Sequence, residues 1–116
     1  MAEDPLVETH NLTRSCNEAL ILASLREGPK HGYQLALDIE QRGRGSFRFQ
    51  HGTLYPILHR LEKKGLIRGA WSKGAEKRKR KSYALTAAGR RYAARQLDSW
   101  HSFIEEFLLA VGVESP

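Results

Sequence analysis

The sequence contains one stretch, GTLYPILHRLEKKG at residues 52–65, whose pattern predicts a helix with two unlike faces. At about 100° per residue, its aliphatic side chains fall within an arc of roughly 100° and are expected to face a core. These side chains are Leu54, Ile57, Leu58 and Leu61. The opposite side carries Tyr55, Pro56, His59, Arg60 and Lys63. The helix is predicted over residues 53–64, with Pro56 in its first turn, where a missing N–H is harmless, and with its end at Gly65.

Two helices are predicted before this stretch. Residues 14–26 carry apolar side chains around much of the helix circumference, which is typical of a buried helix. Gly28 and Pro29 end it, because glycine suits a C-terminal turn and proline cannot continue the helix. A second helix is predicted over residues 32–42, and a flexible linker over 42–46 follows it. The apolar residues of the second helix that are expected to pack against the first are Tyr33, Leu35, Ala36, Leu37 and Ile39.

Two short strands are predicted over residues 66–72 and 82–86, joined by a basic segment at 73–81. Thr86 is then placed to cap a long helix that extends to about residue 111. The order helix, helix, helix, basic hairpin, long helix is typical of a winged helix-turn-helix domain with a dimerisation helix. The predicted fold is therefore mainly α with a small β-hairpin (α+β). We expect a polar N-terminal arm at 1–13, a winged helix-turn-helix domain at 14–86 and a dimerisation helix at 87–116.

The positive charge of the chain is concentrated in its middle. The 116 residues carry a formal net charge of +6. Residues 41–96 hold 16 of the 19 Lys and Arg residues and two of the 13 acids, so this stretch carries +14 and the remainder −8. Such self-repulsion is most easily tolerated beside a polyanion, and for a basic cytoplasmic protein this is most often nucleic acid. A solvated basic face without a partner is the alternative.

Several other classes of protein are disfavoured by the sequence. A chain of this length fits one domain, and its longest apolar runs, residues 19–25 and 107–112, are too short to span a bilayer. One cysteine, Cys16, cannot form an intrachain disulfide, and residues 1–10 contain no apolar signal-peptide segment, so a cytoplasmic location is expected. Because no catalytic motif or metal-ligand spacing is present, we expect neither an enzyme nor a metal or cofactor site.

Two basic elements are interpreted as a DNA-reading surface. The polar face of the helix at 53–64 suits a major groove, and its N-terminus at Thr53 adds a phosphate site. The five consecutive charges at 77–81 suit a wing that lies along the DNA backbone. Tyr33 either reaches a phosphate or packs the helix pair, and Trp71 is expected to pack in the core or the hairpin. The expected DNA contacts are Tyr33, Thr53, Tyr55, Pro56, His59, Arg60, Lys63, Lys77, Arg78, Lys79, Arg80 and Lys81.

The last predicted helix carries an apolar seam. From Ala93 to Val111 its apolar residues alternate in spacings of four and three, as in a coiled coil. The helix at 14–26 is the alternative cover for this seam within the same chain, but that helix must also serve the core. We therefore expect a homodimer, whose symmetry would place two reading helices about 34 Å apart on a roughly palindromic operator. The expected dimer residues are Leu97, Trp100, Ile104, Phe107, Leu108 and Val111.

Three segments together resemble the PadR family of bacterial transcriptional regulators. They are GPKHGYQL at 28–35, GTLYPILHRLEKKGLI at 52–67 and YALTAAGR at 83–90. The HGY and GTLYP-L-RLE-GLI signatures are specific when they occur in this order. The resemblance implies a dimeric winged-helix repressor with the third helix in the major groove and the wing near the DNA backbone.

The single helix after the predicted wing resembles the short class of this family, which includes multidrug-sensing repressors. In those proteins a tryptophan on the last helix pairs with its dimer mate across a central pore, and Trp100 lies where that residue would fall. The resemblance implies a planar aromatic effector at Trp100 and Asp98, and the nearby acids favour a cationic one. Trp100 as a simple seam residue is equally open. The alternative to operator binding is a winged-helix module for protein or RNA contact.

Overall fold

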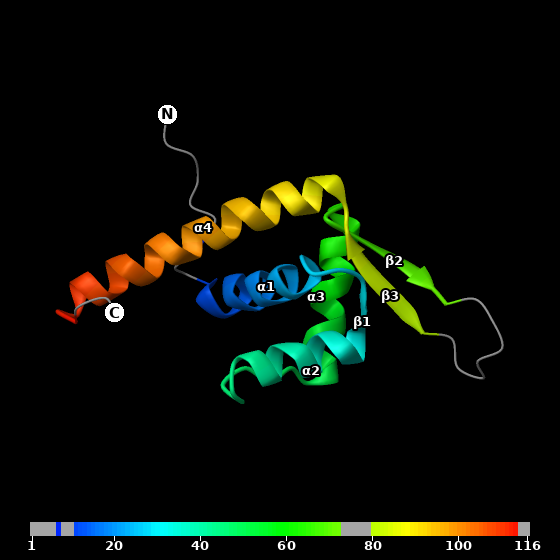
Figure 1. Ribbon diagram of the computed structural model, residues 1–116, viewed down its shortest axis with the longest axis horizontal. Coiled ribbons are helices and arrows are strands. Elements are labelled where there is room, and N and C mark those ends of the chain that lie inside the picture. The colour runs from blue at the N-terminus through cyan, green and yellow to red at the C-terminus, as the bar shows by residue number, and fades with distance from the viewer. Residues whose placement is uncertain (1–6, 8–10, 73–79, 114–116) are drawn as a thin grey trace.

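The computed structural model describes residues 7, 11–72 and 80–113. Over these residues it comprises four helices and three short strands. In chain order they are α1 (Leu12–Leu25), β1 (Lys30–His31), α2 (Gly32–Arg42), α3 (His51–Lys63), β2 (Ile67–Trp71), β3 (Lys81–Leu85) and α4 (Ala87–Ala110). Figure 1 shows α4 running along α1, while the β2–β3 hairpin projects at the end opposite to the C-terminal end of α4. The predicted fold class, mainly α with a small β-hairpin, is confirmed.

The core lies between α1, α2 and α3 and the near end of the sheet. Its fully buried side chains include Ile21 and Leu22 of α1 and Leu35 of α2. The stripe predicted for α3 is confirmed, since all four of its side chains are buried in this cluster. Burial of each such side chain stabilises the fold by about 1.5–3 kcal/mol relative to exposure. This stripe therefore holds α3 against the other two helices.

The apolar set predicted for α2 is only partly buried. Leu35 and Ile39 face α1 and α3 as expected, but Tyr33 and Leu37 are 68% and 39% exposed. The expectation that these two residues pack against α1 is therefore wrong. The reason is geometric, because α1 and α3 cover one face of α2 and these two side chains lie outside that face.

The predicted bounds of most elements are accurate to within one residue, but α1 starts earlier than expected. It begins at Leu12 and not at residue 14, so it takes in the end of the predicted N-terminal arm. The Asn11 side chain accepts a hydrogen bond from the Arg14 N–H (3.4 Å) and so caps the helix there.

The start of α3 also precedes its predicted position. It begins at His51 because the N–H groups of Thr53 and Leu54 both donate to the Gln50 carbonyl oxygen, at 2.9 and 3.0 Å. Pro56 therefore lies inside the helix, and its predicted place in the first turn is wrong. It leaves one backbone carbonyl of the preceding turn without its usual donor.

The sheet is antiparallel, with β3 in the middle of the order β1-β3-β2. β1, which was not predicted from the sequence, pairs Lys30 with Tyr83 and His31 with Ser82. A strand of two residues has no periodicity of its own and is defined only by its pairing partner. β1 joins the helix pair α1 and α2 to the hairpin.

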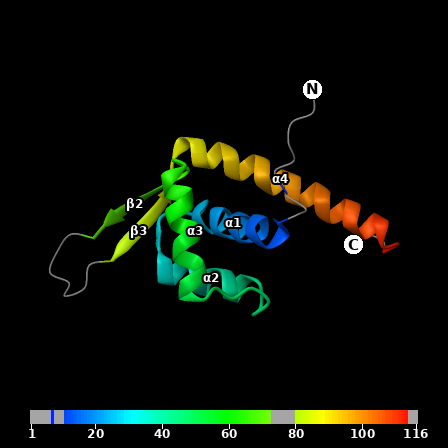
Figure 2. The same cartoon turned by 180° about the vertical axis from the view of Figure 1, so that it is seen from behind.

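Only the near end of the hairpin is buried. In β2, Ile67 is 2% exposed, whereas Trp71 at the other end of the strand is 61% exposed. Within the hairpin, Trp71 contacts Lys81, whose ammonium nitrogen lies 5.9 Å from the centroid of its ring, but the expectation that Trp71 packs in the core is wrong. Figure 2 shows the reason, because the described helices all lie toward the opposite end of the hairpin and none covers its far end.

The start of α4 is fixed on the turn between α3 and β2. Thr86 caps the helix as predicted, since its hydroxyl accepts a hydrogen bond from the Gly89 N–H (2.9 Å). The same hydroxyl donates to the carbonyl oxygen of Gly65 at 2.7 Å. Gly89 is buried directly against the Leu66 carbonyl group, so the helix can approach the turn only without a side chain at this position.

We predict that Gly89→Ala destabilises the protein by about 1–3 kcal/mol, because the added methyl group would overlap the Leu66 backbone, which cannot move freely. Gly52→Ala is the matched control, since nothing lies within 4 Å of a methyl group at that helical position. It should leave the free energy of unfolding unchanged or raise it by up to about 1 kcal/mol. Urea unfolding measures both, and equal stabilities of the two variants would contradict the proposed contact.

Candidate nucleic-acid interface

The N-terminus of α2, the outer face of α3 and the hairpin surround one hollow of about 540 Å³. Aromatic and basic side chains predominate in it, with one carboxylate among them. The lining residues are His31, Gly32, Tyr33, Gln34, Tyr55, His59, Glu62, Trp71, Arg80, Lys81 and Tyr83. Thus the structure brings together predicted DNA-contact residues from three separate segments. We call this feature the reading hollow.

Apart from Arg60, the predicted DNA-contact residues of α3 fall into two groups. Tyr55 and His59 line the reading hollow. Thr53, Pro56 and Lys63 are exposed on the same helix but lie outside it. The helix therefore presents a continuous polar surface, of which the reading hollow is one edge.

Tyr55 connects α3 to the start of α2. A methyl group at Gly32 would lie 2.8 Å from the Tyr55 hydroxyl oxygen and 3.0 Å from its ring, so the tyrosine lies directly over the first residue of α2. Tyr33, the next residue, is largely exposed at the rim of the same hollow. Tyr33 therefore does not pack the helix pair, and its exposed position is compatible with the other role considered for it, a phosphate contact.

Arg60 lies at the edge of the α3 stripe and turns toward α1. Its Nη2 and Nε atoms lie 3.1 and 3.2 Å from Oε1 of Glu18, a buried carboxylate. Arg14 approaches the same oxygen at 3.7 Å. Because a buried carboxylate without a cation is costly, this ion pair stabilises the contact between α1 and α3. Arg60 was predicted as a DNA contact, but its guanidinium is engaged within the protein.

Glu62 joins α3 to both strands of the hairpin. Its Oε1 atom accepts a hydrogen bond from Lys81 Nζ of β3 (3.0 Å), and its Oε2 atom accepts one from the Gly69 N–H of β2 (3.1 Å). The hydrogen bond from Lys81 lowers the pKa of the Glu62 carboxyl below its ordinary value, and the same bond raises the pKa of Lys81. We call these two contacts the Glu62 clamp. Glu62 was not among the predicted site residues, because a single acid in a basic stretch carries no motif for such a contact.

Lys81 is further enclosed by aromatic rings. Its ammonium nitrogen lies 5.4 Å from the centroid of the Tyr83 ring and 5.9 Å from that of Trp71. Lys81 was predicted to contact DNA, but the structure shows it paired with Glu62. Arg80, its neighbour, is exposed at the hollow. The other three residues of the predicted basic wing, Lys77, Arg78 and Lys79, lie outside the described residues.

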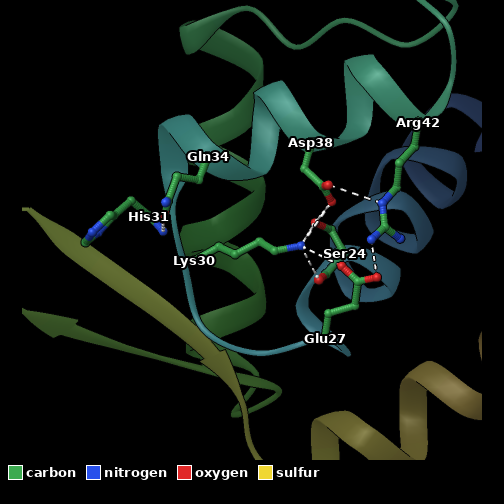
Figure 3. A network of polar contacts seen from close by, with 7 residues as sticks. All are labelled: Ser24, Glu27, Lys30, His31, Gln34, Asp38 and Arg42. Carbon is green, nitrogen blue, oxygen red and sulfur yellow. Dashed lines mark hydrogen bonds and ion pairs between the residues drawn. The ribbon is translucent and has the colours of Figure 1, made fainter.

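A second polar network, drawn in Figure 3, fixes the corner between α1 and α2. Lys30 of β1 lies at the centre, with its Nζ atom 2.9 Å from the Ser24 carbonyl oxygen and 3.0 Å from Asp38 Oδ2. The Ser24 hydroxyl donates to the same Asp38 oxygen at 2.6 Å and so lowers the pKa of that carboxyl. Arg42 bridges Asp38 and Glu27. This network ties the middle and the end of α2 to the C-terminal end of α1 and to β1.

α4 has two unlike halves. In the first half, Ala93 and Gln96 are buried, and the Gln96 amide donates to the Ser15 carbonyl oxygen of α1 at 3.4 Å. In the second half, Ile104 and Phe107 are each at least 50% exposed, and so is Val111, the residue that follows the end of the helix. α1 thus covers only the beginning of the predicted seam. Figures 1 and 2 show the second half of α4 extending past α1.

Trp100 lies at the boundary between these halves. Its ring meets that of Phe103 in an edge-to-face contact, with centroids 5.6 Å apart. Leu97, Trp100 and Leu108 are partly buried, and Asp98 is exposed. The predicted effector residues Trp100 and Asp98 therefore both lie on α4, next to the exposed half of the seam.

Two negative findings apply to the described part of the chain. No helix within it is both long and apolar enough to cross a membrane. Within the same residues, no three His, Cys, Asp or Glu side chains are grouped as they would be around a metal ion.

Comparison with known proteins defines the family. Residues 21–95 match the model of the transcriptional regulator PadR-like family. An uncharacterized protein of Lysinibacillus sphaericus is 30% identical over 90 residues, which cover 78% of this chain and 83% of that one. The crystal structure of a PadR family transcriptional regulator from Eggerthella lenta superposes with a TM-score of 0.75 at 30% identity, over 90% of this chain and 89% of that chain.

A second solved structure contains DNA. The structure of Bacillus subtilis PadR in complex with operator DNA superposes on 69% of this chain, with a TM-score of 0.63 and 26% identity. The match covers only 44% of that longer protein. The similarity to these regulators supports a role in the regulation of transcription and not in catalysis. Because the family model spans well over half of the residues, this chain belongs to the PadR-like family of transcriptional regulators.

Proposed function

We propose that this protein is a repressor that binds a palindromic operator sequence-specifically as a homodimer. The observation that carries the proposal is the Glu62 clamp, which holds the polar face of α3 and the basic hairpin as one surface. A winged helix that reads DNA needs this fixed relation, because helix and wing must meet adjacent parts of one duplex. A winged-helix module for protein or RNA contact is the rival hypothesis, which the binding experiments below distinguish from operator binding.

The proposed contacts follow from exposure. On α3, His59 and Lys63 face outward, together with Thr53 and Pro56 near the start of the helix. We assign base reading to this helix, and phosphate contact to Arg80 together with residues 77–79. Arg60 and Lys81 act indirectly in this proposal, by holding α3 and the hairpin in position.

We predict that the protein binds a preferred duplex with a steep salt dependence. If a dimer neutralises about 6 to 10 phosphates, log K should fall with log salt with a slope of about −0.9 per phosphate. His59→Ala should reduce the preference for that duplex over random DNA. Arg80→Ala should weaken binding to all duplexes alike and reduce the magnitude of the slope by about 1 for each phosphate that is no longer neutralised.

Footprinting on the DNA upstream of the gene that encodes this protein identifies the preferred duplex. Fluorescence anisotropy titrations with that duplex and with random DNA then measure the affinities and their salt dependence. Arg91→Ala is the matched control, since it removes one exposed charge from α4 and should change neither quantity. Equal affinity for the footprinted duplex, random duplex and structured RNA would contradict operator binding and favour the rival module.

The proposed homodimer uses the exposed second half of α4. Ile104, Phe107 and Val111 recur on this helix at the spacing of a coiled-coil seam, and α1 leaves them uncovered. Apolar side chains gathered in this way typically mark a protein interface. A second copy of the same helix satisfies the pattern, because two-fold symmetry brings equivalent seams together. Residues 87–116 would then serve as the dimerisation segment.

We predict that light scattering of the unmodified protein gives twice the 13.2 kDa chain mass at micromolar concentration. Ile104→Asp should convert it to a monomer, because the seam would have to bury an unpaired carboxylate. Ser102→Asp is the control, since it adds the same charge to an exposed position on the opposite side of α4 and should leave the dimer intact. A 13.2 kDa species for the unmodified protein would contradict the proposed dimer.

A planar aromatic effector is proposed at the dimer centre. Trp100 lies at the start of the exposed seam, so its symmetry mate would lie nearby in a dimer. Two indoles can hold a flat ring between them, and each stacked pair contributes about 0.5–1.5 kcal/mol beyond area burial. Asp98, Glu105 and Glu106 give this end negative charge and favour a cation. The effector would release the operator by changing the distance between the two α3 helices.

We predict saturable quenching of Trp100 fluorescence by a flat polycyclic cation, measured in a Trp71→Phe background so that one indole reports. The same dye should weaken operator binding of this variant. A Trp71→Phe/Trp100→Phe variant controls for binding of the dye to the DNA itself. Such binding would lower the operator affinity of both variants equally. No saturable quenching, or quenching without any effect on DNA affinity, would show that Trp100 only packs the seam.

A further inference from the structure

Trp71 is a large apolar side chain held in an exposed position. It lies at the end of β2, opposite Lys81 of β3, and more than half of its surface is accessible. The Lys81 ammonium lies 5.9 Å from the centre of its ring, and Lys81 is itself fixed by Glu62. The indole is therefore positioned by the Glu62 clamp without being buried by it. An exposed indole beside a basic surface is typical of a contact residue.

The reading hollow beside Trp71 combines aromatic surface with positive charge. Tyr33 and Tyr55 face it from the two helices, and Arg80 faces it from the hairpin. Among its described lining residues the carboxylate is that of Glu62, which Lys81 neutralises at 3.0 Å. The lining thus offers apolar rings and an exposed cation, while its acid is already paired. This combination suits a partner in which apolar groups and negatively charged groups alternate over short distances along the chain.

The sugar–phosphate strand of DNA has this chemistry, because deoxyribose faces are apolar and each phosphate carries one charge. In the proposed binding mode α3 enters a major groove and the hairpin lies by the adjacent minor groove. The strand that separates these two grooves must then cross the space between α3 and the hairpin. That space is the reading hollow.

We propose that the reading hollow seats the sugar–phosphate strand between the two grooves, with the Trp71 indole packed against deoxyribose and Arg80 on the adjoining phosphate. This inference rests on the proposed operator binding and assigns Trp71 a contact that carries no charge. Its contribution to affinity is therefore independent of salt, unlike that of Arg80. Stacking of an unpaired base on the same indole would instead require single-stranded nucleic acid.

The test uses a Trp100→Phe variant, in which Trp71 is the remaining tryptophan. Saturating operator duplex should change the Trp71 emission and reduce its quenching by acrylamide. In titrations without that background substitution, Trp71→Ala should lower duplex affinity about tenfold and leave the salt slope unchanged. Trp71→Phe should keep most of the affinity, and the exposed site predicts that neither variant alters the urea unfolding curve.

The outcomes separate this inference from the proposed function. Operator binding with unchanged Trp71 emission and full affinity of Trp71→Ala would overturn the inference alone. Protection of Trp71 by single-stranded DNA but not by duplex would overturn it in favour of base stacking. Failure to bind any duplex would overturn the proposed function, and with it the seat for a duplex strand.

Discussion

The Glu62 carboxylate is the constraint on which the geometry of the DNA-facing surface depends. The near end of the hairpin is held by the pairing of β3 with β1 and by Tyr83 and Leu85 in the core, but its far end projects from the core. Glu62 takes one hydrogen bond from each strand, through Lys81 and Gly69, and thereby fixes the direction of the hairpin relative to α3. Such charge-assisted bonds are stronger than neutral ones and geometrically more restrictive. Glu62 is thus the side chain of α3 that contacts both strands of the hairpin.

The ion pairs also change the meaning of the high basic charge. Lys30, Arg60 and Lys81 each bind a carboxylate that is wholly or partly buried, and each of these ion pairs joins two different elements of the fold. These cations hold α1, α2, α3 and the hairpin together. Arg80 and Lys63 remain exposed on the surface that would meet DNA. The number of basic residues is therefore larger than the expected number of phosphate contacts. The salt dependence of DNA affinity should follow the number of exposed basic residues that are not paired within the protein.

Local patterns in the sequence were enough to predict the order of the four helices and the hairpin, the buried stripe of α3 and the Thr86 cap, because each depends on neighbours within a few residues. The Arg60–Glu18 pair, which links residues 42 positions apart, could not be predicted in this way. A helical wheel of α3 places Arg60 outside the apolar stripe, but it cannot show that Glu18 of α1 lies next to Arg60 in the folded protein. The exposure of Trp71 was missed for the same reason, since it depends on where the helices end in space.

In the proposed binding mode Lys81 serves the DNA-facing surface by neutralising and holding Glu62, and does not itself bind phosphate. The most direct test of this role compares the loss of operator affinity caused by Lys81→Met in the unmodified protein with the loss it causes in a Glu62→Gln variant, at one salt concentration. We expect a large loss in the first background and a small one in the second, because without the Glu62 carboxylate Lys81 has no partner to neutralise or hold. An equal loss in both backgrounds would contradict this role and identify Lys81 as a direct phosphate contact.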